Sequence, residues 1–264
     1  MRVGRIVRGT LAAALLAASP TAAAEADGGS PRAATAVVAA EYAGTWAQLR
    51  VLSALVTIPV LGEVTVTTTA VLRLTMTGEG RTLSIAGEAC SLDQEMSTSL
   101  LDSIFPEGLV RNAGGFETSA SLREEDGEIR FFQPRRWMIF GARLDDPAHD
   151  SLPTDPEDER VVDADRDGQP GVTVRFSGLV NGDVWLVQRQ WSTMRGTVDG
   201  DHIDGRIQWG EERSALGATS VLLETMPPSR TNPDAAASYF RMTRVGAGDD
   251  CAAILARRDT LFAR

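Results

Sequence analysis

The stretch that decides the fold is residues 64–77, Val-Thr-Val-Thr-Thr-Thr-Ala-Val-Leu-Arg-Leu-Thr-Met-Thr. Its apolar side chains fall on one parity and its threonines on the other, interrupted by Thr68 on the apolar side and Val71 on the polar side. Successive side chains of a β-strand point to opposite faces, so a period of two indicates one dry and one wet face. Many of these residues are β-branched, which also favours a strand. The pattern predicts a long strand at the surface of a β-sheet.

The residues after this stretch complete a hairpin. Gly78-Glu79-Gly80 supplies a turn, and the alternation then resumes at Leu83, Ile85, Gly87 and Ala89. Glycine tolerates the backbone conformations that tight turns need. We therefore expect residues 64–89 to form two paired strands.

Short strands joined by turns predict the rest of the fold. Asn181-Gly182 and Asp199-Gly200 are strong two-residue hairpin signals. The further strands expected are 116–123, 128–140, 172–180, 183–191, 194–198, 202–209, 213–224 and 238–245. Consecutive hairpins with one polar face each indicate a mainly β protein, and an antiparallel up-and-down β-barrel is the first choice. A sandwich of two sheets remains the alternative.

Helices are expected in two places. Met96, Leu100, Leu101 and Ile104 recur at helical spacing, which predicts a short helix over 94–105 that ends before Pro106. A closing helix is expected over 250–262, capped by Asp249. Residues 141–160 are rich in Asp and Pro and predict a long loop, part of an insertion over 141–171.

The N-terminus has the three parts of a secretory signal. Arg2, Arg5 and Arg8 precede the apolar run 11–18, and small residues surround a cleavage position after Ala24. We therefore expect a signal peptide over 1–24, a flexible leader over 25–40 and a single barrel domain over 41–264. The protein is expected to be exported, either to a periplasm or out of the cell.

Charge and hydropathy exclude several partners. Removing three arginines with the signal changes the formal net charge from −10 to −13. Such a surface repels phosphate backbones, and no basic stripe is present, so we expect no nucleic-acid partner. The apolar run 11–18 is well short of the roughly 20 residues that span a bilayer, and no other window is apolar enough, so no membrane span is expected.

Two cysteines, Cys90 and Cys251, remain after signal cleavage. An even number of cysteines in an exported chain favours a disulfide. The bond would join the end of the first hairpin to the closing helix. Two buried free thiols are the alternative.

The segment Tyr42-Ala43-Gly44-Thr45-Trp46, which precedes the first expected long strand, resembles the Gly-x-Trp signature of lipocalins. The resemblance implies that Trp46 closes one end of an up-and-down barrel and packs against an arginine of the last strand, Arg241 or Arg244. It also implies a cup that carries a small apolar molecule. The chain departs from lipocalins in its insertions at 91–115 and 141–171 and in a helix that follows the last strand. Trp46 as an ordinary core residue is the alternative.

A second motif predicts a metal site. Asp163, Asp165 and Asp167 occupy positions 1, 3 and 5 of a calcium loop, with Gly168 at the sharp turn and the carbonyl of Gln169 as the position-7 ligand. The pattern resembles the D-x-D-x-D-G loops of EF-hand-like proteins. It lacks the glutamate of position 12, where Val174 stands, so another carboxylate would have to come from upstream: Asp155, Glu157, Asp158 or Glu159. The alternative is an acidic turn whose side chains bond their own backbone.

Recognisable catalytic motifs are missing. His149 and His202 are the two histidines, and the sequence has no zinc-protease, serine-hydrolase or phosphate-loop motif. The interpretation favoured is a binder of a small apolar ligand with a structural calcium loop. Two alternatives stay open: a carbohydrate-active hydrolase with a carboxylate pair, for which Glu88 and Asp183 are candidates facing a cavity, and a structural or surface protein.

Overall fold

The structure is a computed structural model that describes residues 38–59, 61–225 and 227–263, all within the unit Ala36–Arg264. The expected signal peptide and residues 25–37 of the expected leader lie outside the described residues. At the end of the expected leader, Ala39 is fully buried and its N–H donates to the Gly80 carbonyl. In the part of the chain that the structure describes, no helix is both long and apolar enough to cross a membrane.

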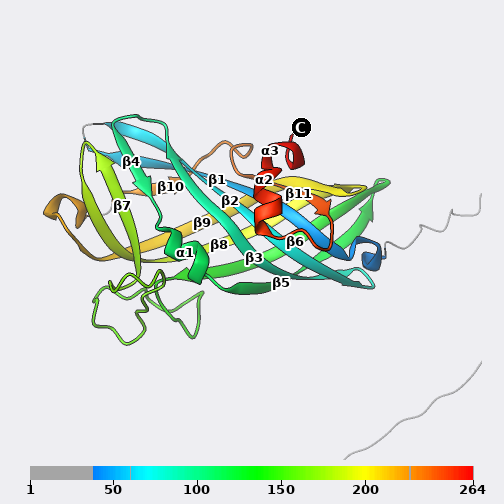
Figure 1. Ribbon diagram of the computed structural model, residues 1–264, viewed down its shortest axis with the longest axis horizontal. Helices are drawn as coiled ribbons and strands as arrows, with labels where there is room; N and C mark the ends of the chain where they lie inside the picture. Colours follow the sequence, from blue (N-terminus) through cyan, green and yellow to red (C-terminus); the bar gives the residue numbers. More distant parts are fainter. Residues whose placement is uncertain (1–37, 60, 226, 264) are drawn as a thin grey trace, which may run out of the picture. The chain divides into compact units, whose positions relative to one another are not determined.

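Antiparallel strands make up most of the structure (Figure 1). The strands are β1 (Gly44–Ile58), β2 (Gly62–Glu79), β3 (Thr82–Met96), β4 (Leu101–Ile104), β5 (Gly115–Glu125), β6 (Glu128–Phe140), β7 (Val172–Gly178), β8 (Gly182–Asp199), β9 (His202–Ala218), β10 (Ser229–Thr231) and β11 (Tyr239–Val245). The helices are short: η1 (Ala39–Tyr42), α1 (Glu107–Asn112), η2 (Val221–Leu223), α2 (Cys251–Ala256) and α3 (Arg258–Leu261).

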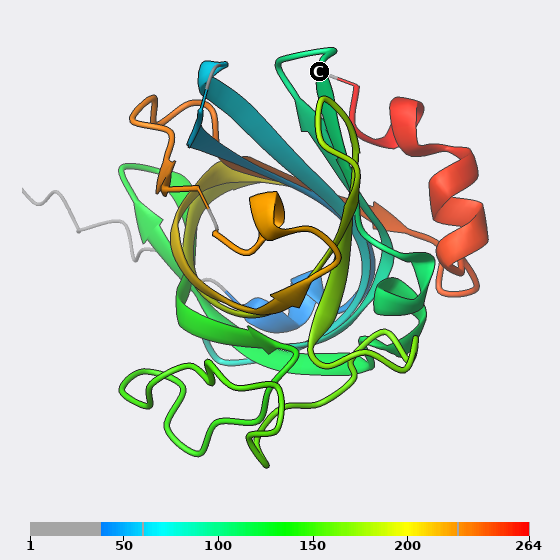
Figure 2. The same ribbon diagram turned by 90° about the vertical axis from the view of Figure 1, so that its left-hand side faces the viewer.

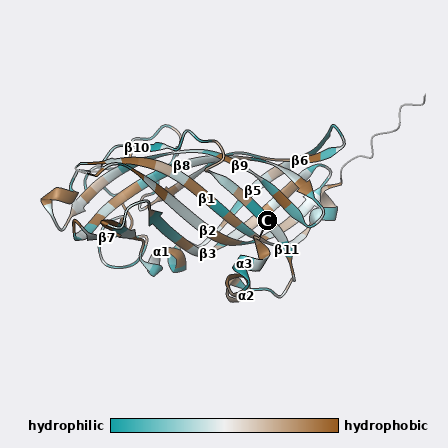
Figure 3. Cartoon of the chain, turned by 90° about the horizontal axis from the view of Figure 1, so that it is seen from above, coloured by the Kyte–Doolittle hydropathy of each residue, from teal (hydrophilic) through white to brown (hydrophobic). Residues whose placement is uncertain are grey.

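Eight of the strands close into a ring. Around the ring the order is β1, β2, β3, β5, β6, β8, β9 and β11, and β11 pairs with β1. Neighbours therefore follow chain order, as the hairpin signals predicted. Hydrophilic and hydrophobic residues alternate along the strands, so each strand presents one face to the inside of the ring (Figure 3).

The remaining strands widen one end of the ring. β6 pairs with β8 over residues 188–198 of β8, and β7 takes over the same edge at residues 182–186. In the same way β11 pairs with residues 45–51 of β1 and β10 with residues 54–56. β4 extends the sheet beyond β7. This exchange of neighbours departs from a regular barrel.

An apolar cluster fills the other end of the ring. Trp46 is fully buried in this cluster, and its indole N–H donates to the Tyr42 carbonyl at 3.0 Å. The Arg244 guanidinium lies 4.8 Å from the Trp46 ring centroid and donates to the Ala43 carbonyl. Of the two arginines proposed for this contact, Arg244 therefore makes it. Arg241 instead donates to the Phe262 carbonyl, outside the ring.

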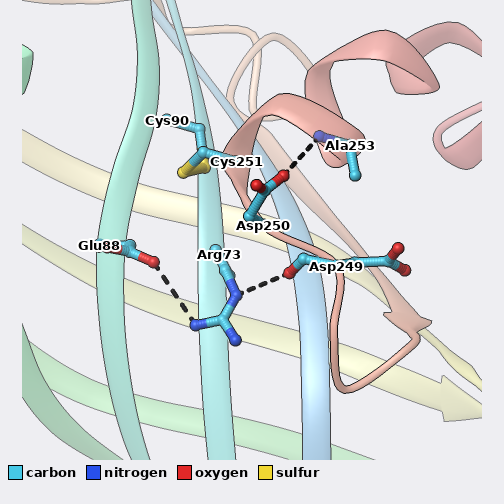
Figure 4. Close-up of a disulfide and its surroundings, with 7 residues drawn as sticks. All are labelled: Arg73, Glu88, Cys90, Asp249, Asp250, Cys251 and Ala253. Carbon is cyan, nitrogen blue, oxygen red and sulfur yellow. Dashed lines mark hydrogen bonds and ion pairs between the residues drawn. A yellow bond between two sulfur atoms is a disulfide. The ribbon is translucent and has the colours of Figure 1, made fainter.

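A disulfide fastens the C-terminal helices to the outside of the ring (Figure 4). Cys90 of β3 bonds to Cys251, the first residue of α2, with 5.1 Å between their Cα atoms. Ile254 of α2 and Phe262 pack against Leu49 and Val51 on the outer face of β1. The disulfide confirms the expected pairing of the two cysteines. The packing of the C-terminal helices leaves β1 buried on both faces.

Several sequence-based boundaries were wrong. Residues 94–105 are not a helix: β3 runs to Met96, β4 follows at Leu101–Ile104, and the helix of this insertion is α1. The expected strands 183–191 and 194–198 are one continuous strand, β8, and 202–209 joins the first half of 213–224 in β9. The closing helix is split into α2 and α3, and its cap is Asp250, whose carboxylate accepts from the Ala253 N–H.

Loss of the disulfide should destabilise the ring. The bond closes a loop with a sequence separation of 161, so the double variant Cys90→Ala/Cys251→Ala should lose up to about 5 kcal/mol of unfolding free energy. Urea unfolding of the oxidised protein, the reduced protein and the double variant measures this. Reduced wild-type protein should match the double variant. Equal midpoints for all three samples would contradict the prediction.

Candidate functional site

The widened end of the ring encloses a cavity of about 780 Å³. Its lining includes Leu52, Ala54 and Val56 of β1 and Val184 and Leu186 of β8. On β1 the side chains that point inward are even-numbered, from Trp46 in the closed end to Val56 in the cavity. The lining is therefore mostly aliphatic because the dry face of each strand continues past the packed cluster.

The opening of the cavity is partly covered by η2, which lies across the ring when it is seen end-on (Figure 2). Leu223 of η2 lines the cavity, as does its neighbour Leu222, which is 78% exposed. Leu179 also lines the cavity and is exposed, and its N–H donates to the carbonyl of exposed Leu100. Water-exposed leucines therefore collect at the opening, which is unusual for a surface without a partner.

One carboxylate lines the cavity among the described residues, and both of its oxygens accept hydrogen bonds. Glu211 of β9 accepts from Gln188 Nε2 at 3.1 Å and from Ser229 Oγ at 3.0 Å. Its Oε1 also lies 3.4 Å from Arg213 Nε. This local charge is therefore balanced within the wall of the cavity.

A polar layer separates the cavity from the closed end. Arg50 of β1 is 6% exposed, and its Nη2 donates to Ser192 Oγ of β8 at 3.0 Å, across the inside of the ring. Within the described chain, Arg50 Nε has no hydrogen-bond partner. Gln190, also 6% exposed, lines the cavity, and its Nε2 is likewise without a partner among the described residues. Buried donors of this kind are costly and rare.

A second arginine lies beside this layer. Arg136 of β6 is paired in register with Ser192, the residue that receives the Arg50 hydrogen bond. Its guanidinium lies 4.0 Å from the centroid of the Phe116 ring, and no ion pair joins it to an acid of the described residues. Burial lowers the pKa of Arg50 to about 10, and the charge of Arg136 lowers it too. Burial also lowers the pKa of Arg136. Two unneutralised cations thus lie beneath an apolar cavity.

The two carboxylates proposed for hydrolysis do not face the cavity. Glu88 is on the outer face of β3, where it lies 3.5 Å from Arg73 (Figure 4). Asp183 lies at the end of β8 and forms an ion pair with Arg175 at 2.9 Å. Both histidines are polar surface residues: His149 contacts Asp146 in the loop, and His202 is exposed on β9. The cavity therefore holds no acid pair among the residues described.

The structure brings the three aspartates of the second motif together. Ligand atoms of Asp163, Asp165 and Asp167 all lie within 4.8 Å of one another. Arg166 and Gly168 have φ values of 59° and 85°, so the backbone curls around the carboxylates. Asp165 is 5% exposed, and the other two are at the surface.

Most carboxylate oxygens of this loop already accept hydrogen bonds. Asp163 accepts from the N–H groups of Asp167 and Gly168, and Asp167 accepts from the Gln169 N–H and from Thr173 Oγ1. Asp165 Oδ2 accepts from the Thr173 N–H at 2.9 Å. Asp165 Oδ1, however, is buried and has no partner in the described part of the chain. Burial, the largest cause, raises the pKa of Asp165.

The upstream acids do not join this group. Asp158 is held by Arg160, and this side-chain hydrogen bond lowers the pKa of Asp158 to about 2. Asp155 accepts from the Glu157 N–H within its own turn. The acidic group found in the described residues contains the three aspartates only, so the expected fourth carboxylate is not supplied from residues 155–159.

The aspartate loop is coupled to the wall of the cavity. Asn112 of α1 donates to the Asp165 carbonyl at 3.1 Å, and a Cβ placed on Gly108 would meet the same carbonyl at 2.3 Å. The loop then leads into β7, where Val172 and Val174 line the cavity. Sequence reasoning found the aspartates and the strand that follows them, expected over 172–180, but it did not find α1.

Comparisons with family models, with curated proteins and with solved structures give no match for this chain. The class is therefore defined by the geometry: a β protein whose eight-stranded ring encloses an apolar cavity over a cationic layer.

Replacement of Arg50 by an apolar side chain should stabilise the fold. Arg50→Met removes a buried charge that has no acid partner and leaves one hydroxyl, Ser192 Oγ, without its donor, so we expect a net gain on the order of 1 kcal/mol. Chemical denaturation measures it. Arg241→Met on the outer face is the control and should lose stability, because Arg241 holds the Phe262 carbonyl. If Arg50→Met lost as much unfolding free energy as Arg241→Met, the prediction would be wrong.

Proposed function

We propose that the protein binds a small apolar molecule in the cavity at the widened end of the ring. The cavity of about 780 Å³ carries the proposal, since ligand pockets typically have volumes of about 300–1,000 Å³ and apolar linings. Leu52, Val184 and Leu186 would contact the ligand. The exposed leucines beside η2 support the same function, because they give an apolar molecule a path of entry.

The proposed fold class is an up-and-down barrel of the lipocalin type, forming a single domain over residues 41–264. Chain order around the ring supports it, as does the contact between Trp46 and Arg244 at the closed end. The exchange of β7 for β6 and of β10 for β11 would be the variation that widens the cup on this chain.

The aspartate loop is proposed to bind calcium in a structural role. Ca²⁺ takes six to eight oxygen ligands, and a carbonyl of Gln169 and water would complete the three carboxylates. The buried, unpartnered Asp165 Oδ1 supports a cation, because three close carboxylates otherwise repel one another. Its role would be to hold the loop against α1 and to brace β7.

Export to a periplasm or to the cell exterior is the proposed location. The disulfide between Cys90 and Cys251 supports an oxidising compartment, since such bonds are rare in reducing ones. The proposed signal over residues 1–24 would direct the chain there.

Binding of an uncharged apolar dye tests the ligand proposal. Nile red should fluoresce when it enters the cavity, and Ala54→Trp should weaken its binding at least about tenfold because the indole would occupy the cavity. Ser84→Trp, on the exposed face of β3, is the matched control and should bind as wild type. Equal binding by both variants would place the dye elsewhere.

Thermal unfolding tests the calcium proposal. At ten times its dissociation constant, Ca²⁺ should add about 1.4 kcal/mol and raise Tm by about 3–6 °C relative to protein in chelator. Asp165→Asn should abolish the increase, whereas Asp155→Asn should retain it. If Tm in millimolar Ca²⁺ equals Tm in chelator, the loop is an acidic turn.

A further inference from the structure

The polar layer beneath the cavity combines β1 with the neighbouring strands β6 and β8, with which β1 does not pair. β1 contributes Arg50, β6 contributes Arg136, and β8 contributes Gln190 and Ser192. In register, Ser192 pairs with Trp209 of β9, which itself lines the cavity. Gln190 lines the cavity, whereas Arg50, Arg136 and Ser192 do not, so we call these four residues the floor, with Gln190 as the member that reaches the cavity.

This floor contains unused hydrogen-bond donors. Arg50 Nε and Gln190 Nε2 are both buried and unpartnered within the described residues. The Trp209 indole N–H is already used, since it donates to Ser238 Oγ at 3.0 Å. Unused donors next to an apolar cavity call for an acceptor that enters from the cavity.

The charge of the floor is also uncompensated. Arg50 and Arg136 carry two positive charges, and the two charged residues that line the cavity, Glu211 and Arg213, form an ion pair with each other. An isolated buried cation has a large desolvation cost, and an anion that forms hydrogen bonds with it removes much of that cost. A neutral ligand would leave this cost in place.

We propose that the ligand is an amphiphile with an apolar body and a carboxylate, and that the carboxylate lies on the floor, between Arg50 and Gln190. The apolar body extends towards the opening, along Leu52 and Leu186, with its end near η2. This inference rests on the proposed ligand-binding function and specifies the chemistry of its ligand. Arg136 contributes positive charge to the floor, and its guanidinium is positioned by the ring of Phe116.

A pair of ligands that differ only in the head group tests the inference. Dodecanoate and dodecanol carry the same chain, and both can be titrated at neutral pH while tryptophan fluorescence is followed, since Trp209 lines the cavity. Dodecanoate should bind at least about tenfold more tightly, because hydrogen bonds to a charged group are stronger than those to a neutral one.

Variants identify the floor as the source of this preference. Arg50→Met should weaken dodecanoate binding about tenfold to a hundredfold and should leave dodecanol binding within about twofold. Gln190→Leu should reduce the preference by a smaller factor. Arg195→Met is the matched control, because Arg195 is on the same strand as Gln190 but stacks on Phe132 outside the ring. It should retain the full preference.

The outcomes separate the two proposals. Equal affinities for dodecanoate and dodecanol, unchanged in Arg50→Met, would overturn the carboxylate inference and leave the ligand-binding function standing. If Arg50→Met weakened the binding of dodecanoate and dodecanol equally, with an unchanged melting curve, the carboxylate inference would also be overturned. If neither ligand nor Nile red binds, the ligand-binding function itself is wrong.

Discussion

Pairing between the first and last strands of the ring is the interaction on which the structure depends. β1 meets β11 from Thr45 opposite Val245 to Val51 opposite Tyr239, and this pairing alone joins strands from opposite ends of the ring's chain order. Without it the sheet would have two open edges, which invite association with other chains. The inner face of β1 then supplies Trp46 to the closed end, Arg50 to the floor and Leu52 to the cavity.

The sequence predicted strands well where one face is dry and the other wet. β2 has this pattern, so residues 64–77 were assigned correctly. β1 was missed because its outer face is covered by α2 and α3 while its inner face lies in the core, so no alternation remains. Residues 94–105 looked helical because of the spacing of their apolar residues, yet Leu100 and Ile104 are exposed while Leu101 is buried, so these side chains do not share one buried face.

The two candidate sites also differ in how far the sequence could predict them. The three aspartates lie within five residues, so their convergence could be read from spacing alone. The cavity and its floor combine residues from β1, β6, β8 and β9, and nothing near Arg50 in the sequence marks it as buried. The Arg50 side chain points inward because of the register of β1 with its neighbours, and that register depends on the closed ring. A buried arginine without an acid is also a cost to stability that folding alone does not explain, which is why it indicates function.

Ring closure has a consequence for the order of events during synthesis. Because β1 cannot find β11 until nearly the whole chain is available, the longest-range contacts form last, and such topologies fold slowly. During synthesis from the N-terminus, β1 is therefore without β11 at a stage when the hairpin of β2 and β3 can already form. Cys251 follows β11 in the chain, so the disulfide with Cys90 also needs residues that are synthesised late.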